Sequence, residues 1–352
     1  MTPHDRFPAQ PLTTTVIGSW PKPDWLSSKD HDRTGWVADR VWRFEGAELS
    51  AMQDEATRWA VREQESTGVA IVTDGEIRRD DYVYHLLRHL DGFDFDQRVS
   101  KIARSGSWRW NQPSITGPIT SKAPALRPEY EFVQGITDRN VKVTLPGPMT
   151  IIDSVNDAYY HDEEALAMAL AQVIQQEVRA LADAGCSTVQ FDEPSFARYP
   201  DKLERFGLRA LNACVAGVDG ITTAVHVCRG YPIVDYAKSS ADSYERIFPL
   251  LAASAIDHVS IEASNESFDW RTLDLLRGKG VILGTIDVGA AEVESVALIR
   301  ERLAKALEWV DPWKLYPAPD CGLVFLAPEV AKQKLIHLTA AADDLRNSFM
   351  HE

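Results

Sequence analysis

The residues best suited to chemistry in this chain are a histidine, two cysteines and a glutamate that each close a β-rich run. His226 and Cys228 end TAVHVC, Glu262 lies in HVSIEA, and Cys321 ends LYPAPDC. An imidazole nitrogen, two thiolate sulfurs and a carboxylate oxygen suit Zn²⁺ better than they suit hard, oxygen-preferring ions. Residues two apart in a strand point to the same face, so His226 and Cys228 can share one ion. The sequence therefore predicts a zinc site.

Each of these residues also has an ordinary structural explanation. A single cysteine is most often a small buried apolar residue, and a single histidine is most often a satisfied core residue. No CxxC pair occurs, so the spacing is not that of a zinc finger or ribbon. The shared position of the candidates, where strands end and loops begin, favours a common site. The other cysteines, Cys186 and Cys214, are expected to pack between helices and strands.

Length, charge and cysteine content limit the class of protein. The chain has 352 residues, 45% of them hydrophobic, and a formal net charge of -15. An acidic chain without a long Lys/Arg run is not expected to bind nucleic acid or an anionic membrane. The N-terminus lacks the layout of a signal peptide, and no apolar stretch is long enough to span a bilayer. Only four cysteines are present, which with the other features indicates a reduced, cytoplasmic setting.

Eight short β-rich runs alternate with amphipathic stretches along the chain. The runs are TTTVIGS, GVAIVTDGE, VKVTLPGP, STVQFDEP, TTAVHVC, HVSIEAS, VILGTIDV and WKLYPAPDCG. Apolar residues recur at three- and four-residue intervals, as in helices packed on one face, in residues 47–67, 162–184, 242–253 and 293–309. This alternation predicts one (β/α)8 TIM barrel domain over residues 1–352. In such barrels the chemistry gathers at the C-terminal ends of the strands.

Residues 92–140 interrupt the alternation of strands and helices. The segment DFDQRVSKIARSGSWRWNQPSITGPI alternates apolar and polar residues, which predicts an inserted β-hairpin after the second strand. The hairpin would lie beside the barrel mouth, where Trp108 and Trp110 either contact a ligand or pack the hairpin onto the barrel. Residues 1–10 are expected to form a flexible arm.

Further polar residues close other predicted strands, at equivalent places around the ring. They are Ser19, Glu76, Asp192, Glu193 and Asp287. Unpaired acids in a partly buried pocket are costly, so we expect a metal or a substrate ammonium group near some of them. Capping of the following helix is the competing explanation for each residue. The Gly- or Pro-bounded turns that hold Glu76 and Asp192 favour a functional role for these two.

Several sequence blocks of the chain resemble the catalytic barrel of cobalamin-independent methionine synthases. TTTVIGSWPKP is similar to the family's opening TTxIGSFPQ, and DGEIRRDDYVYHL resembles its GE-x-R-x-D-x-V segment. PGPMTII, QFDEPS, HVC, IEAS and PDCGL match further blocks in the same order, from Thr13 to the end of the chain. The resemblance implies zinc-dependent transfer of a methyl group to a thiol, with homocysteine as acceptor and methionine as product.

The resemblance also assigns roles to the candidate residues. It implies that zinc is held by His226, Cys228, Glu262 and Cys321. It implies that the amino acid part of homocysteine is held by Ser19, Glu76 and Asp192. Two thiolates and a carboxylate give zinc an anionic shell, which suits binding of a thiol more than activation of water. Bound to such an ion, a thiol is deprotonated near neutral pH and remains nucleophilic enough to accept a methyl group.

Three departures from the family pattern bear on the methyl donor. Long members carry an N-terminal half that has no counterpart here. Asp287 keeps the aspartate of an Asp-x-His pattern and is the candidate catalytic residue, but Gly289 replaces the histidine thought to assist proton transfer. Asp153 and Ser154 stand where long members carry a tryptophan that helps to hold the folate. These departures favour a methylated corrinoid, which can be protein-borne, over polyglutamylated methylfolate, because cobalt leaves without protonation.

Other functions are also compatible with these residues. A sister branch of the fold adds a thiol to an epoxide, and a sulfonate thiol would require basic residues such as Arg78, Arg79 and Arg229. A metal-free decarboxylase of the related superfamily and a nonenzymatic zinc-holding module are further alternatives. His85 and His89 are spaced i,i+4 in YVYHLLRH, but without a nearby third ligand they are expected to be structural.

Overall fold

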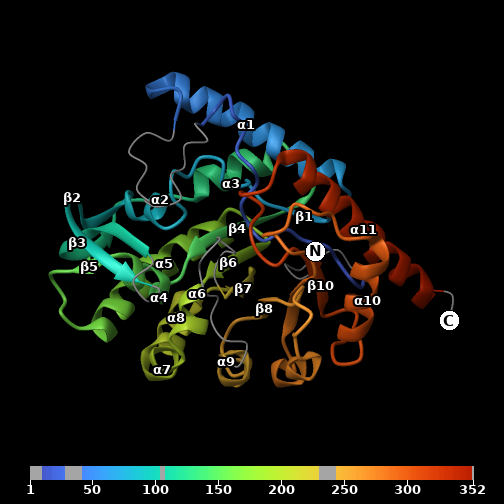
Figure 1. Ribbon diagram of the computed structural model, residues 1–352. Helices are drawn as coiled ribbons and strands as arrows, with labels where there is room; N and C mark the ends of the chain where they lie inside the picture. The colour runs from blue at the N-terminus through green and yellow to red at the C-terminus, as the bar shows by residue number, and fades with distance from the viewer. Residues whose placement is uncertain (1–9, 28–41, 104–107, 230–242, 351–352) are drawn as a thin grey trace.

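The computed structural model describes residues 10–27, 42–103, 108–229 and 243–350 of the chain (Figure 1). Its main sheet is parallel and curls around a central axis. The strands, in their spatial order, are β1 (Ile71–Val72), β4 (Asn140–Pro146), β6 (Thr188–Asp192), β7 (Thr222–Val227), β8 (His258–Glu262), β9 (Gly280–Gly284) and β10 (Leu315–Ala318). Every neighbouring pair in this sheet is parallel, so the C-terminal ends of all these strands lie at one rim.

The first predicted strand closes the ring between β1 and β10. Thr15 forms a parallel bridge with Ile71, and the backbone N–H of Ile71 donates to the carbonyl of Thr14 at 3.1 Å. On the other side, the N–H of Thr15 donates to the carbonyl of Pro317 at 3.0 Å. This segment is bridged at a single residue pair and is not a regular strand. With it the eight-membered ring is complete, and the predicted (β/α)8 barrel is confirmed.

Helices cover the outside of the barrel. Their bounds are α1 (Gly46–Ser66), α2 (Tyr84–Leu87), α3 (Arg127–Gln134), α4 (Pro148–Ser154), α5 (Glu163–Asp183), α6 (Pro194–Arg198), α7 (Pro200–Lys202), α8 (Leu208–Val215), α9 (Ser243–Ala252), α10 (Val296–Ala306) and α11 (Pro328–Met350), with a π-helical turn at Leu203–Gly207 and a 3-10 helix at Trp270–Leu276. The four helical stretches expected from apolar periodicity correspond to α1, α5, α9 and α10. Within the described ranges, no helix combines the length and apolar character needed to cross a bilayer.

The first and last helices seal the outer layer. Helix α1 lies beside α11 (Figure 1), where Lys332 forms an ion pair with Glu63 at 3.0 Å. The hydroxyl of Thr339 on α11 donates to the carbonyl of Thr67, just after α1, at 2.7 Å. Helices α1 and α11 are thus bonded to each other on one side of the barrel.

The predicted hairpin insertion is confirmed. Strands β2 (Leu90–Ala103) and β3 (Trp108–Ser121) are antiparallel, and the short β5 (Asn156–Asp157) pairs in parallel with β3. The three strands form a separate sheet at one side of the barrel (Figure 1). Helix α3 also lies within the 92–140 segment, for which the sequence analysis predicts no helix. The side chains of Trp108 and Trp110 and most of the proposed N-terminal arm lie outside what the structure describes.

The interior of the barrel is only partly apolar. Ile17, Ala224, Ile282 and Ala318 form a small buried cluster that is separate from the large core between sheet and helices. Two of its members are alanines, so this layer fills little volume. Polar side chains occupy the barrel interior as well, among them the buried Lys142 of β4, which is 1% exposed.

Gly284, at the end of β9, lies where two backbone segments approach closely. A Cβ at this position would lie 2.6 Å from Asp320 Cα and 2.8 Å from the Ile261 carbonyl oxygen, and no side-chain rotation relieves such contacts. We expect Gly284→Ala to destabilise the fold by about 1–3 kcal/mol, measured as a lower Tm. Gly117→Ala is the matched control, because its Cβ would meet only Gly92 Cα at 3.9 Å. Equal Tm values for the two variants would contradict this packing.

Candidate metal centre

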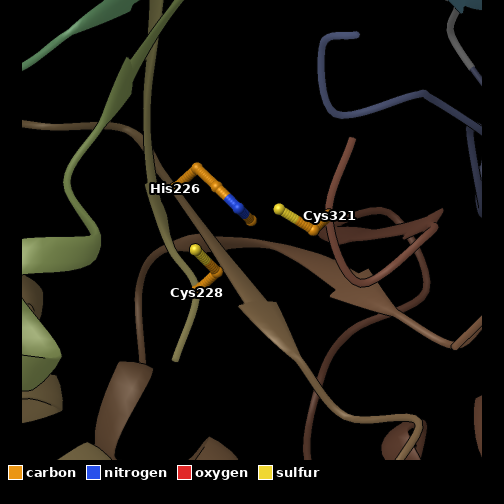
Figure 2. A group of neighbouring side chains, drawn as sticks. All are labelled: His226, Cys228 and Cys321. Atoms are coloured by element: carbon orange, nitrogen blue, oxygen red, sulfur yellow. The ribbon is translucent and has the colours of Figure 1, made fainter. Parts of the chain in front are cut away.

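Three of the four predicted metal ligands meet at the rim of the barrel. One ligand atom each from His226, Cys228 and Cys321 lies within 4.8 Å of the other two, and the three side chains point toward one another (Figure 2). Strand β7 supplies His226 and leads into Cys228, while Cys321 follows β10. All three residues are buried, with 3–5% of their surface exposed. The predicted convergence of distant segments is therefore present.

The histidine is oriented for metal binding by its neighbour on β8. Nδ1 of His226 lies 2.9 Å from the hydroxyl oxygen of Ser260, which is fully buried. Nε2 is directed toward the sulfurs (Figure 2) and has no hydrogen-bond partner among the described residues. A metal-binding Nε2 must be unprotonated, so Nδ1 would carry the proton and donate a hydrogen bond to the hydroxyl oxygen of Ser260.

The two thiols are poorly accommodated without a cation. A hydrogen bond with Cys228, together with burial, raises the pKa of Cys321 well above its usual range. The hydrogen bond and the apolar surroundings both favour the protonated thiol, and the charges of Cys228 and Glu262 act in the same direction. His226, Cys228 and Cys321 would hold a divalent ion, and its charge would favour the thiolate form of both cysteines. The donor set and its burial therefore fit zinc.

Glu262 lies at the end of the neighbouring strand β8 but is outside the close group of three. Its carboxylate Oε2 is 3.4 Å from Nε of Arg229, and its backbone N–H donates to the hydroxyl of Tyr244 at 3.2 Å. The same hydroxyl donates to the carbonyl of Val227 at 3.0 Å, so Tyr244 joins the ends of β7 and β8. The assignment of Glu262 as fourth zinc ligand stays a prediction.

Asp320 positions the Cys321 loop and was not identified from the sequence. Its Oδ1 accepts hydrogen bonds from the backbone N–H groups of Ala263 at 3.2 Å and Ser264 at 3.1 Å, and its other oxygen accepts from the Ser264 hydroxyl. These bonds tie the residue before Cys321 to the segment directly after Glu262. The only sequence signal was an aspartate beside a candidate ligand, because its partners are more than 50 positions away.

Asp192 borders the metal group directly. It is paired in register with His226 on the neighbouring strand, so the two side chains leave the sheet side by side. Nε2 of Gln190 donates to its Oδ1 at 2.8 Å. Burial raises the pKa of Asp192 to about 7, and the carboxylate of Glu76 acts in the same direction. A positively charged ligand beside Asp192 would stabilise the carboxylate form of its side chain.

Glu76 and Ser19 line the same rim from the first two segments of the barrel. Glu76 has a positive φ of 54°, unusual for a residue with a side chain, and its carboxylate accepts from the Thr144 hydroxyl at 2.7 Å. The Arg79 guanidinium lies 3.4 Å from the same oxygen. The hydroxyl of Ser19 is buried and has no hydrogen-bond partner among the residues that the structure describes. The roles of Ser19, Glu76 and Asp192 in substrate binding stay predictions.

Two other strand-end acids form local structural bonds. Oδ1 of Asp287 accepts from the backbone N–H of Gly289 at 2.7 Å and so closes its own turn. Glu193 accepts from the N–H groups of Met149 at 2.9 Å and Thr150 at 2.9 Å, at the start of α4. The carboxylate of Glu193 thus caps α4, which precedes it in the chain, and makes no side-chain cap bond at the following helix α6, where capping is the structural alternative for this set. A catalytic role for Asp287 remains a prediction.

The remaining candidates have the structural roles expected of them. Nε2 of His85 lies 2.8 Å from the Glu129 carboxylate, and Nδ1 of His89 lies 2.9 Å from the His85 carbonyl oxygen. Neither histidine belongs to a metal-type group within the described residues. Cys186 and Cys214 are fully buried.

The fold and the site define a barrel protein with a buried group of one histidine and two cysteines, of the kind that can hold zinc. Residues 12–344 match the family model described as cobalamin-independent synthase, catalytic domain. A methionine synthase of Sulfolobus acidocaldarius is 31% identical over 93% of this chain and 90% of the relative. One of Pyrococcus abyssi is 30% identical over 97% of this chain and 95% of the relative. The chain therefore belongs to the cobalamin-independent methionine synthase family of methyltransferases.

Solved structures agree with this assignment. A B12-independent methionine synthase from a Shewanella species, solved in complex with selenomethionine, has a TM-score of 0.89 and 34% identity, covering 97% of this chain and 100% of that one. A protein from Listeria monocytogenes described as a putative vitamin-B12 independent methionine synthase has a TM-score of 0.73 at 22% identity, covering 96% and 99%. At that identity, the second likeness supports the fold alone.

Ser260 offers a test of how His226 is oriented. Ser260→Ala removes the partner of Nδ1 while leaving all three close ligands in place, so the imidazole loses its fixed tautomer and orientation. We expect zinc affinity to fall about 10- to 100-fold, measured by competition with a chelator. Ser264→Ala, which changes a hydroxyl bonded to Asp320 and not to a ligand, is the comparison variant and should lose less. Unchanged affinity in Ser260→Ala would contradict the proposed orientation.

Proposed function

We propose that this protein methylates the sulfur of homocysteine to give methionine, using a zinc ion held by His226, Cys228, Cys321 and Glu262. The observation that carries the proposal is the buried group of one imidazole and two thiols next to Asp192 in a chain of this family. The Shewanella relative was solved with selenomethionine, the selenium analogue of the proposed product, which supports an amino acid site in the same barrel.

Different residues around the metal group would bind different parts of the substrate. Zinc, when bound, supplies an acidic centre that holds the acceptor sulfur as a thiolate near neutral pH. Asp192 and Glu76 offer carboxylates to the substrate ammonium group, and the Ser19 hydroxyl is available for its carboxylate. Thr144 and Arg79 hold Glu76 in place. A rigid rim can then align the donor methyl group, the sulfur and the leaving atom.

The proposed donor is a methylated corrinoid, either free or borne by a partner protein. Gly289 offers no side chain to protonate a leaving nitrogen. Asp153 is part of an ion-pair network, with its carboxylate bonded to Lys101 at 2.8 Å, to Arg198 at 2.5 Å and to Tyr199 at 3.2 Å. Asp153 and Ser154 thus offer no aromatic surface for a folate ring at these two positions, which supports the corrinoid donor.

A sulfonate thiol is the weaker alternative because the three candidate arginines already have acidic partners. Arg78 pairs with Asp54, Arg79 with Glu76, and Arg229 with Glu262. Membership in a methyltransferase family also removes the metal-free decarboxylase alternative.

The proposal is tested by metal analysis and a matrix of donors and acceptors. We expect one equivalent of zinc per chain and methionine formation from homocysteine with methylcobalamin. Turnover with methyltetrahydrofolate but not with methylcobalamin would refute the donor while leaving the acceptor intact. Zinc-loaded protein that methylates another thiol in preference to homocysteine would refute the acceptor.

A further inference from the structure

A buried lysine lies inside the barrel below the proposed amino acid site. Lys142 of β4 is 1% exposed, and its Nζ donates to the carbonyl of Val16 at 2.5 Å and to Oε1 of Gln190 at 2.7 Å. Gln190 of β6 is fully buried. Val16 belongs to the segment that closes the ring. The Lys142 amine therefore links three segments of the barrel, which are this segment, β4 and β6.

The lysine fixes which way the Gln190 amide points. An ammonium or amine on Lys142 donates hydrogen bonds to its neighbours, so the amide oxygen of Gln190 must face it. The amide nitrogen then faces the opposite way, where it donates to Oδ1 of Asp192 at 2.8 Å and to the carbonyl of Ile17 at 3.1 Å. Without Lys142 the amide oxygen of Gln190 loses its donor, and only the Ile17 carbonyl and Asp192 itself still favour the orientation in which Nε2 faces Asp192. The hydrogen bond to Asp192 is then held less firmly.

The hydrogen bond from Lys142 to Gln190 is kept in both protonation states of the lysine. Burial lowers the pKa of Lys142 to about 7, while the carboxylates of Asp192 and Glu76 act to raise it. Both protonation states of the side chain donate to Gln190, so the hydrogen-bond order does not depend on the charge. A donated hydrogen bond stabilises the acceptor form of Asp192, the form that a substrate ammonium group needs.

We propose that Lys142 is a positioning residue that acts through Gln190 to hold Asp192 as an acceptor for the ammonium group of the thiol substrate. The inference rests on the proposed function and deepens it. It assigns the preference for an amino acid thiol over a plain carboxylic thiol to a chain of hydrogen bonds that begins in the barrel interior. A lysine that served only to fill the core would change stability but not this preference.

The test measures binding by calorimetry to the zinc-loaded protein, with homocysteine and with 4-mercaptobutanoate, which lacks only the amino group. The readout is the ratio of the two dissociation constants. In the unaltered protein we expect homocysteine to bind more tightly, and in Lys142→Met we expect this preference to fall about tenfold or more, as for a lost hydrogen bond to a charged group. Zinc content should be retained, because Lys142 contacts none of the three close ligands through the bonds described above.

Two further variants keep the test decisive. Gln190→Met interrupts the same chain without removing a charge and should reduce the preference similarly, and the double variant should lose little more than either single one. Lys334→Met is the matched control, since Lys334 is a fully buried lysine of α11 that bonds to Glu294 and to the backbone carbonyls of Asp287 and Glu292, and to neither Gln190 nor Asp192. It should lower the Tm but leave the ratio unchanged.

The outcomes separate this inference from the proposed function. If the unaltered protein prefers homocysteine and both Lys142→Met and Gln190→Met keep the full preference, the inference is wrong and the proposed function stands. If the unaltered protein itself does not distinguish the two thiols, the proposed acceptor site is wrong and the inference fails with it. If Lys142→Met does not fold, Gln190→Met decides alone.

Discussion

Replacing Cys228 with serine is expected to remove the bound zinc and to slow methylation of homocysteine by more than about a hundredfold, the upper range for losing even a supporting group. The substitution removes one of two thiolates and leaves the buried Cys321 without its neighbouring sulfur. A hydroxyl is a poor zinc ligand at neutral pH because it stays protonated. Metal analysis after dialysis and a methionine-formation assay measure the two effects together.

Cys214→Ser is the matched control for this prediction. Cys214 is a fully buried cysteine of α8 whose sulfur is bonded to the Ala210 carbonyl within its own helix. It should retain a full equivalent of zinc whatever its effect on stability. Full zinc content and normal activity in Cys228→Ser would show that the cluster is not the metal site.

The second large effect is expected from Asp192→Asn. The exchange keeps the shape of the side chain but removes the negative charge offered to the substrate ammonium group. We expect kcat/KM for homocysteine to fall about 30- to 1000-fold, the range for losing one partner of a buried charged pair. The loss should be much smaller with 4-mercaptobutanoate, which has no ammonium group. Steady-state kinetics with both thiols measure the difference.

A buried acid outside the site provides the comparison for Asp192. Glu177 of α5 is 1% exposed and accepts hydrogen bonds from the backbone N–H groups of Ala125 and Leu126. Glu177→Gln should affect both thiols equally. An equal loss for both thiols in Asp192→Asn would mean that Asp192 supports the structure of the rim and does not recognise the amino group.

Much of the barrel could be predicted because its signals are local. The two-residue period of strands places His226 and Cys228 on one face, and the rule that strand ends share a rim brings Cys321 to them. Helices α1 and α5 each span 21 residues, long enough for apolar periodicity to be unmistakable. Helix α3 has only eight residues, RPEYEFVQ, which is shorter than the window over which such a period can be recognised.

The supporting residues of the site could not be predicted because their partners are distant in sequence. Ser260 meets His226 across 34 positions, and Lys142 meets Gln190 across 48. The sequence shows that such residues face inward, but which of them meet depends on the stagger between strands of the closed barrel. The same limit applies to Glu262, where strand position alone does not show whether the carboxylate turns toward the metal group or toward Arg229.

X-ray absorption at the zinc edge, on protein with and without homocysteine, shows whether the cluster holds zinc and whether the zinc receives the substrate sulfur. We expect a zinc ion with two sulfur ligands at about 2.3 Å together with nitrogen and oxygen ligands, and a third sulfur once homocysteine is added. A zinc shell of nitrogen and oxygen alone, or a two-sulfur shell that does not change with saturating homocysteine, would contradict this expectation.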